Sequence, residues 1–223
     1  MTKTSWQDAL PELLSSIGQT AWMVGWSFAI TVLLGLALGV WLRICAPDGL
    51  RPNRVVYQVV GAIVNVARSL PFLILMIALI GLTRWLVGTA YGPTAAIVPL
   101  AIGAIPFYAR VVESALREVL PGKLEAAQVM GANLRQTVWK VLLPESLPGL
   151  VSGATLTLVT LIGYSTMAGA IGGGGVGDFA IRFGYQRFNG PVLLMAVILL
   201  IVIVQLVQSI GDAIVHRMAH RRG

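Results

Sequence analysis

Glu125-Ala126-Ala127-Gln128-Val129-Met130-Gly131 is followed after nine residues by Val141-Leu142-Leu143-Pro144. This stretch is a polar, basic island, and long apolar runs lie on both sides of it. An apolar run of about 20 residues is long enough to cross the hydrocarbon core of a bilayer as a helix. The island is therefore predicted to be a loop between membrane spans.

The composition of the rest of the chain agrees with a membrane protein. Of the 223 residues, 57% are hydrophobic and only 11% are charged, and the mean hydropathy is +0.82. These values exclude an ordinary soluble domain. We expect an all-α integral membrane fold in which residues 1–223 form a single transmembrane domain. Its five spans are predicted at about 21–42, 55–82, 94–112, 150–171 and 191–210, with a cytoplasmic loop at about 113–148.

The distribution of basic residues predicts the topology. Lys and Arg residues in short loops next to spans stay on the cytoplasmic side. An outside N-terminus and a cytoplasmic C-terminus put most of them inside and, with Arg68 set apart, leave only Lys3, Arg84, Arg182 and Arg187 outside. The basic residues lie beside apolar runs, so the pI of about 10.2 does not indicate nucleic-acid binding.

Two glycines in the first predicted span, Gly35 and Gly39, are four residues apart. Small residues at this spacing let two helices approach closely in lipid. Glycine is also common in membrane helices generally, so the pattern leaves both explanations open.

The second and third predicted spans carry residues that are unusual in a membrane helix. Arg68 is costly in lipid and needs a partner or water, and Glu113 is the candidate partner. Pro71 should kink the second span, so this segment either lines a kinked pore or ties two helices together through Arg68. Pro99 and Pro106 predict that the third span is bent or broken.

The loop itself is predicted to form two short helices at an angle. Gly131 allows a sharp turn because glycine tolerates positive φ, and Asn133 is a plausible N-cap for the second helix. Pro144 should end that helix. Glu125 is expected to order the loop through a charge-assisted hydrogen bond.

The sequence offers no set of residues for catalysis or for a cofactor. The glycine-rich stretch at 169–177 lacks the Lys and Ser or Thr of a phosphate-binding loop and is predicted to be a flexible turn at the outer face. Cys45 is the only cysteine, and His216 and His220 are best explained as a solvated tail, so no metal site is expected. The chain is predicted not to be an enzyme, and any work must come from a partner.

The loop stretch resembles the pattern by which membrane subunits of bacterial ABC importers bind their ATPase, with Val141 in place of the usual isoleucine. Across residues 55–212 the chain resembles the permease subunits of methionine importers, which are type I importers. The most specific pieces are Arg68-Ser69-Leu70-Pro71-Phe72, Pro106-Phe107-Tyr108-Ala109-Arg110-Val111-Val112-Glu113, Leu142-Leu143-Pro144-Glu145-Ser146-Leu147-Pro148-Gly149-Leu150 and Gly163-Tyr164-Ser165-Thr166-Met167.

The resemblance implies a permease in the bacterial cytoplasmic (inner) membrane that works as a homodimer by alternating access. It also implies two ATPase subunits that carry ATP and Mg on the cytoplasmic face, and a methionine-binding protein outside. ATPase coupling would fall to Glu125, Ala126, Ala127, Gly131, Asn133 and Pro144. The gate would be Met167, with Tyr164, Ser165 and Thr166 along the path, while Arg68, Pro71, Pro106 and Glu113 would shape the bundle.

Two other functions fit the same residues. A permease for another amino acid or small solute would keep the loop and change the pore. A membrane adaptor that recruits an ATPase without transporting would need the loop alone.

Overall fold

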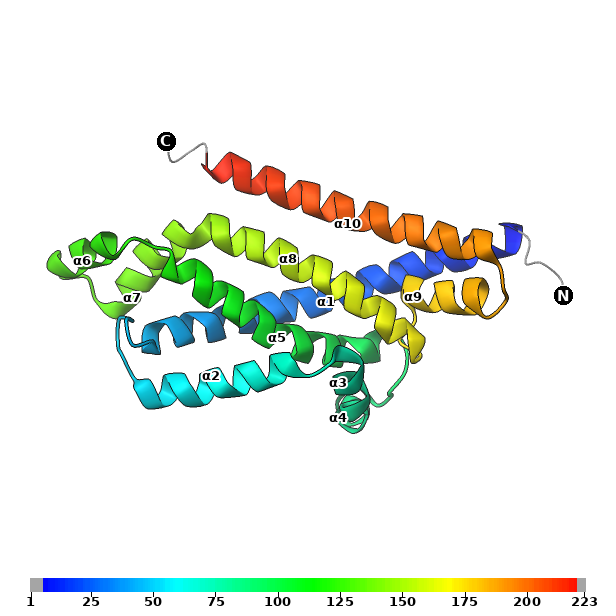
Figure 1. Ribbon diagram of the computed structural model, residues 1–223, viewed down its shortest axis with the longest axis horizontal. Coiled ribbons are helices and arrows are strands. Elements are labelled where there is room, and N and C mark those ends of the chain that lie inside the picture. The colour runs from blue at the N-terminus through cyan, green and yellow to red at the C-terminus, as the bar shows by residue number, and fades with distance from the viewer. Residues whose placement is uncertain (1–5, 220–223) are drawn as a thin grey trace.

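The computed structural model describes residues 6–219, which form a bundle of long helices with short helices at both ends (Figure 1). Four helical runs are long and apolar enough to cross a membrane, and a bent pair would make a fifth. These runs include α1 (Trp6–Cys45), α5 (Pro93–Arg117), α8 (Leu143–Ala170) and α10 (Gly190–Ala219), and each helix begins before the span predicted for it. Lys3 and His220 lie outside the described residues.

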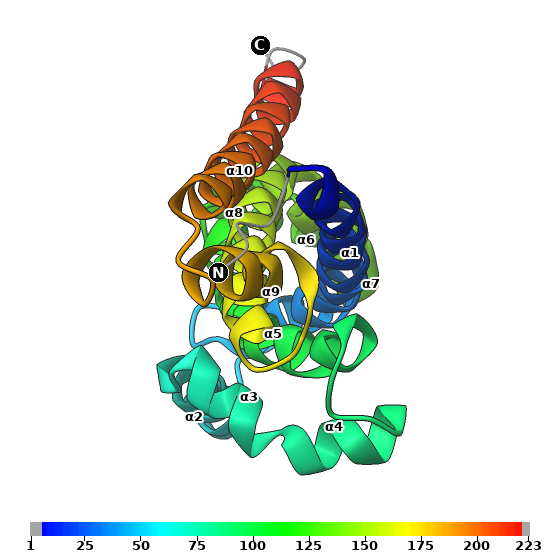
Figure 2. The ribbon, with the colours of Figure 1, turned by 90° about the vertical axis from the view of Figure 1, so that its right-hand side faces the viewer.

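Helix α5 is the centre of the bundle and contacts α1, α8 and α2 (Arg54–Ser69). Figure 2 shows α10 on one side of the bundle and α2 to α4 on the other. The buried residues Leu100, Tyr108 and Val112 place the core along α5. Only 11% of the most apolar stretch of α10 is buried within the chain, as expected of a helix that faces lipid.

The two glycines of α1 face α5 and allow it to approach. A Cβ on Gly39 would lie 2.5 Å from the carbonyl oxygen of Ala109, and a Cβ on Gly35 would lie 2.9 Å from the ring of Tyr108. Real Cβ atoms do not reach such distances, so a larger residue at either position would push the helices apart. The close-approach explanation of the pair is confirmed.

The second predicted span, at about 55–82, is not one helix. Helix α2 (Arg54–Ser69) and helix α3 (Phe72–Ala78) meet at an angle of 102°, and α4 (Ile80–Val87) follows α3. The break has the cause that the sequence predicted, because Leu70, the residue before Pro71, is extended at φ −74° and ψ 129°. The predicted kink is therefore present, and at 102° it is large enough to turn the chain sideways at this point.

The third predicted span is more regular than expected, whereas the second is less regular. Helix α5 continues through Pro99 and Pro106 without interruption, so of the two predicted outcomes, a bent or a broken helix, the broken helix is wrong. Both prolines are buried, and packing against α1 and α8 on either side holds the helix together where a lone helix would have opened.

The loop predicted at 113–148 is shorter than expected, because α5 runs to Arg117 and α8 begins at Leu143. We call residues 118–142 the α5–α8 loop. It contains α6 (Pro121–Val129), α7 (Leu134–Thr137) and the π-helical turn η1 (Val138–Leu142). Pro144 was predicted to end the second loop helix, and this prediction was wrong. Pro144 lies in the first turn of α8. The wider π turn before it accommodates the missing backbone donor, so residues 134–170 form one helical run.

The glycine-rich stretch also differs from its prediction. A turn with positive φ at Gly172 and Gly174 leads into α9 (Gly175–Phe179) and the π-helical η2 (Ala180–Tyr185). Backbone N–H groups at the start of α9 donate to the side chains of Gln19 and Thr20 on α1, at 2.8 Å and 2.9 Å. The glycines therefore fit a buried helix start against α1 and do not form a free loop.

Candidate functional site

Helix α6 projects from one end of the bundle (Figure 1). Its buried contact is Ala127, whereas Glu125 and Ala126 are exposed. The apolar side chains that end it also face outward, with Val129 89% and Met130 80% exposed. Exposed apolar side chains beside charged ones, at the tip of a bundle, suit contact with another protein.

The turn after α6 has the local chemistry that the sequence predicted. Gly131 adopts φ 78°, which is the left-handed conformation expected for it. The Asn133 side chain accepts a hydrogen bond from the backbone N–H of Gln136 at 2.9 Å. The Gln136 side chain accepts one from the backbone N–H of Asn133 at the same distance. This reciprocal capping box fixes the start of α7; the spacing Asn-x-x-Gln could have identified Gln136 as well.

The carboxylate that orders α6 is not the predicted one. Glu125 has no hydrogen bond or ion pair in the described part of the chain, so the expected ordering bond is wrong. Instead, Lys123 Nζ lies 2.6 Å from Oε2 of Glu145. This contact joins α6 to the first turn of α8.

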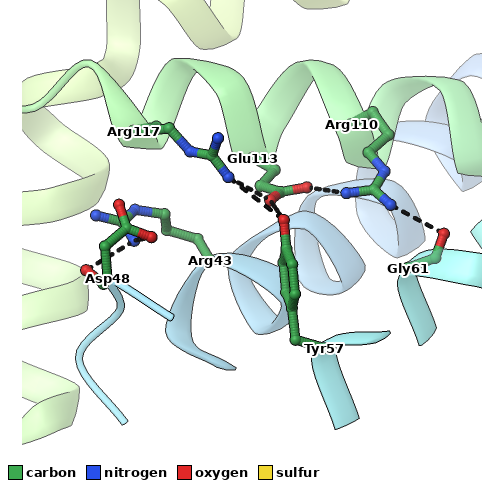
Figure 3. Close-up of polar contacts among 7 residues, drawn as sticks. All are labelled: Arg43, Asp48, Tyr57, Gly61, Arg110, Glu113 and Arg117. Carbon is green, nitrogen blue, oxygen red and sulfur yellow. Dashed lines mark hydrogen bonds and ion pairs between the residues drawn. The ribbon is translucent and has the colours of Figure 1, made fainter. Parts of the chain in front are cut away.

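A polar cleft of about 290 Å³ opens beside α6. Glu125 and Gln128 line it from α6, and Arg117 lines it from the end of α5. Arg43 and Asp48, whose Nη1 and Oδ1 atoms are 3.3 Å apart, close its other side (Figure 3). The cleft presents both charges on the loop end of the bundle, so it can accept polar side chains of either sign.

A buried carboxylate ties α2 to α5 near the same end (Figure 3). Glu113 is only 3% exposed. Its Oε1 accepts hydrogen bonds from Tyr57 Oη at 2.8 Å and Arg117 Nη2 at 3.0 Å. Its Oε2 lies 2.6 Å from Arg110 Nη1. Arg110 Nη2 also donates to the carbonyl oxygen of Gly61 at 2.9 Å, so the cluster clamps α2 at two points.

The predicted pairing of Arg68 with Glu113 is therefore wrong. Arg68 follows Tyr57 by eleven residues, which places it about 16 Å farther along α2 than the residue that reaches Glu113. The true partners, Arg110 and Arg117, were missed although they stand three and four residues from Glu113 on one helix. Opposite charges at these spacings are the sequence signal that could have found them.

Met167 lies near the other end of α8 and is 48% exposed. Its neighbour Ser165 is 1% exposed, and its hydroxyl donates to the carbonyl oxygen of Ile162 at 2.7 Å. The Thr166 hydroxyl donates to the Gly163 carbonyl oxygen at 2.7 Å. The hydroxyl donors of this segment thus serve their own helix, and Met167 is the bulky side chain that it presents outward.

Tyr164 connects this segment to the broken second span. Its ring stacks on that of Phe72 at a centroid distance of 4.2 Å and an interplanar angle of 2°. Phe72 directly follows Pro71, so the break in the second span places this ring against α8. The structure keeps the predicted gate residues together, and places them at the opposite end of α8 from the predicted coupling residues.

Comparison with known proteins assigns these features to a family. Residues 31–220 match the family described as binding-protein-dependent transport system inner membrane component. The chain is 53% identical to a probable D-methionine transport system permease protein of Vibrio cholerae, over 94% of this chain and 93% of the relative. It is 50% identical to the methionine import system permease protein of Bacillus subtilis, over 78% of each chain.

A solved structure of the MetNI methionine ABC transporter in inward-facing conformations has a chain of the same fold. The TM-score is 0.94 at 45% sequence identity, and the match covers 96% of this chain and 99% of that one. ATP hydrolysis belongs to a separate subunit in such systems, so the chain is not an enzyme. The chain belongs to the family of inner membrane components of binding-protein-dependent transport systems, and it is a multi-pass permease subunit of an ABC importer.

Proposed function

We propose that the chain forms the transmembrane path of an ATP-driven methionine importer. The observation that carries this proposal is the match of nearly the whole chain to a chain of a methionine ABC transporter, at a TM-score of 0.94. The bacterial relatives named for methionine transport support the same substrate. The N-terminus lies outside and the C-terminus inside, so α6 and the α5–α8 loop face the cytoplasm.

The ATPase binds at the loop end of the bundle. The exposed side chains of Val129 and Met130 supply apolar contact, and the polar cleft beside Glu125 accepts side chains of the partner. Lys123 and Glu145 hold α6 against α8. A movement of α6 is therefore passed to α8 through an ion pair as well as through the chain.

Two copies of the chain enclose one path, and Met167 closes it. A thioether is apolar, flexible and unbranched, so two copies meeting at a symmetry axis can seal a narrow path and still move aside. The exposure of Met167, beside a buried Ser165, supports this role. ATP binding draws the two ATPases together and opens the path outward, and hydrolysis returns it to the inward-facing state.

The test is uptake of radiolabelled methionine into vesicles that contain this chain with its ATPase, with its methionine-binding protein on the outer side. The proposal expects uptake that requires ATP and the binding protein together. D- and L-methionine are measured separately, and unlabelled amino acids are added as competitors. ATP-dependent uptake of another labelled amino acid, with no uptake of labelled methionine, would assign the permease to that substrate.

A vesicle that hydrolyses ATP without accumulating any solute would instead indicate an adaptor. Omission of the binding protein is the matched control, because leakage through damaged vesicles does not depend on it.

A further inference from the structure

The break in the second span leaves a cavity beside α5 and α8. It measures about 110 Å³, far more than one water molecule needs. We call it the break pocket, and its chemically distinctive lining residues are Arg68, Phe72, Phe107 and Tyr164. The pocket lies one helical turn before Met167 along α8, because Tyr164 precedes that residue by three positions.

Arg68 brings an uncompensated positive charge to this pocket. It follows Arg54, the first residue of α2, by fourteen positions and so lies about 21 Å along the helix, well inside a hydrocarbon core of about 30 Å. Its side chain is exposed, and none of the ion pairs among the described residues includes it. A charge at this depth needs a partner or water, and within the described chain the predicted partner, Glu113, is taken by Arg110 and Arg117.

The other walls of the break pocket are aromatic. The stacked rings of Phe72 and Tyr164 form one wall, and the Arg68 guanidinium lies 6.0 Å from the centre of the Phe107 ring. Gly103 lets the Phe72 ring lie close to α5, since a Cβ at this position would already be 3.3 Å from that ring. Aromatic rings of this kind make favourable contacts with a thioether.

The end of α2 also offers acceptors for a positively charged ammonium group. Helix α2 ends at Ser69, and Leu70 is already extended, so the last turn has carbonyl oxygens without partners in the helix. One of them, on Val66, accepts the Ser69 hydroxyl at 2.8 Å. The others carry the negative end of the helix dipole, beside a cation that attracts a carboxylate.

We propose that the break pocket is a transit site for the amino acid on its way past Met167. Arg68 binds the α-carboxylate, the carbonyl oxygens at the end of α2 receive the ammonium group, and the aromatic rings contact the side chain. This inference rests on the proposed import of methionine and adds where the permease itself touches its substrate. The hydroxyl groups of α8 do not compete for this role, because those of Thr157, Thr160, Ser165 and Thr166 donate to carbonyl oxygens of their own helix.

The first test uses Arg68→Gln in the assembled transporter, with Arg84→Gln as the matched control. Arg84 is also exposed but lies on α4, away from the pocket. Loss of one charge-assisted hydrogen bond should lower the uptake rate of methionine roughly tenfold. Arg68→Lys should give a smaller loss, and Arg84→Gln should import at the parent rate. Parent-like uptake by Arg68→Gln overturns the proposal.

The second test locates the substrate directly. A diazirine analogue of methionine, shown to compete with methionine for uptake, is delivered by the binding protein and activated by light during turnover. The proposal expects adducts on the pocket residues Phe72, Phe107 or Tyr164, which excess methionine removes and Arg68→Gln reduces. Adducts confined to other segments of the permease overturn it.

The outcomes separate this inference from the function on which it rests. If the parent complex imports no methionine, the proposed function fails. If it imports methionine and the adducts miss the break pocket, only the transit site fails. If Arg68→Gln loses a bound phospholipid in native mass spectrometry while its pocket adducts persist, Arg68 holds a lipid headgroup and its assignment to the substrate carboxylate is wrong.

Discussion

Lys123 Nζ and Glu145 Oε2, 2.6 Å apart, join the exposed helix α6 to the first turn of α8. Both side chains are partly exposed, at 47% and 35%, so the pair adds at most about 1 kcal/mol to the free energy of unfolding. We expect its importance to be mechanical, because it is a side-chain link between α6 and a helix that also carries Met167.

We expect Lys123→Glu to reduce methionine uptake more than it reduces stability, because it places like charges at this link. The double variant Lys123→Glu with Glu145→Lys restores opposite charges and should recover most of the uptake. Uptake and thermal unfolding are measured on the same preparations. Equal uptake by the single and double variants would show that the ion pair plays no part in coupling.

Glu113→Gln should destabilise the folded protein strongly. The change leaves the guanidinium of Arg110, which is largely buried, without its charge partner, and breaking a buried pair costs about 3–5 kcal/mol. Tyr57→Phe removes one hydrogen bond to the same carboxylate and should cost about 1 kcal/mol. Thermal unfolding in detergent measures both.

The exposed Glu118 gives the matched control for that experiment, and Glu118→Gln should unfold like the parent. Arg68→Ala should also stay within about 0.5 kcal/mol of the parent, because Arg68 has no ion pair in the described chain to lose. A large loss of stability in Arg68→Ala would instead support the predicted pairing of Arg68 with Glu113.

Gly131→Ala should weaken binding of the ATPase, because the left-handed backbone at this position costs about 1–2 kcal/mol for any residue with a Cβ. Gly88→Ala is the matched control. Gly88 has a φ of 83° against 78° at Gly131, and neither has neighbours within 4 Å of an added Cβ. Both variants should lose similar stability, while only Gly131→Ala loses co-purified ATPase. Equal retention of the ATPase by the two would contradict a coupling role for this turn.

Met167→Cys in a Cys45→Ser background should cross-link between two copies of the chain, most readily when the gate is closed. Ser165→Cys in the same background is the control, since Ser165 is on the same helix but buried and should not cross-link. Cross-linked dimer is measured on gels with and without ATP. The absence of a Met167→Cys dimer in every nucleotide state would place this residue away from the axis.

The sequence predicts best where the cause is local. Gly131 and Asn133 do what their own chemistry requires, within a few residues of the chain. The position of the break at Pro71 is also set locally, but the angle of the break is not. A proline fixes where a helix is interrupted, whereas the 102° turn depends on how α3 packs against α5. Pro99 and Pro106 make the same point in reverse, because neighbouring helices keep α5 whole around them.

Long-range pairing is the part that the sequence did not predict. Arg68 was matched with Glu113 because carboxylates are scarce in the spans, yet scarcity does not say which face or depth each residue occupies. Tyr57 reaches Glu113 because α2 and α5 lie side by side in one register, whereas Arg110 meets Glu113 from three residues away on α5 itself. Glu125 was likewise expected to order the loop because the loop motif contains it, although it is Glu145, at the start of α8, that meets Lys123.

We expect the uninterrupted helical run from Leu134 to Ala170 to act as a lever in the permease. Its 37 residues span about 55 Å, and they connect the arm in the loop to the arm that bears Met167 without a break in the helix. A tilt of about 5° about the loop end therefore displaces the far end by about 5 Å, a full helical turn. A small movement of the ATPase would in this way become a displacement as wide as a side chain at Met167. The length of the helical run sets the amplification.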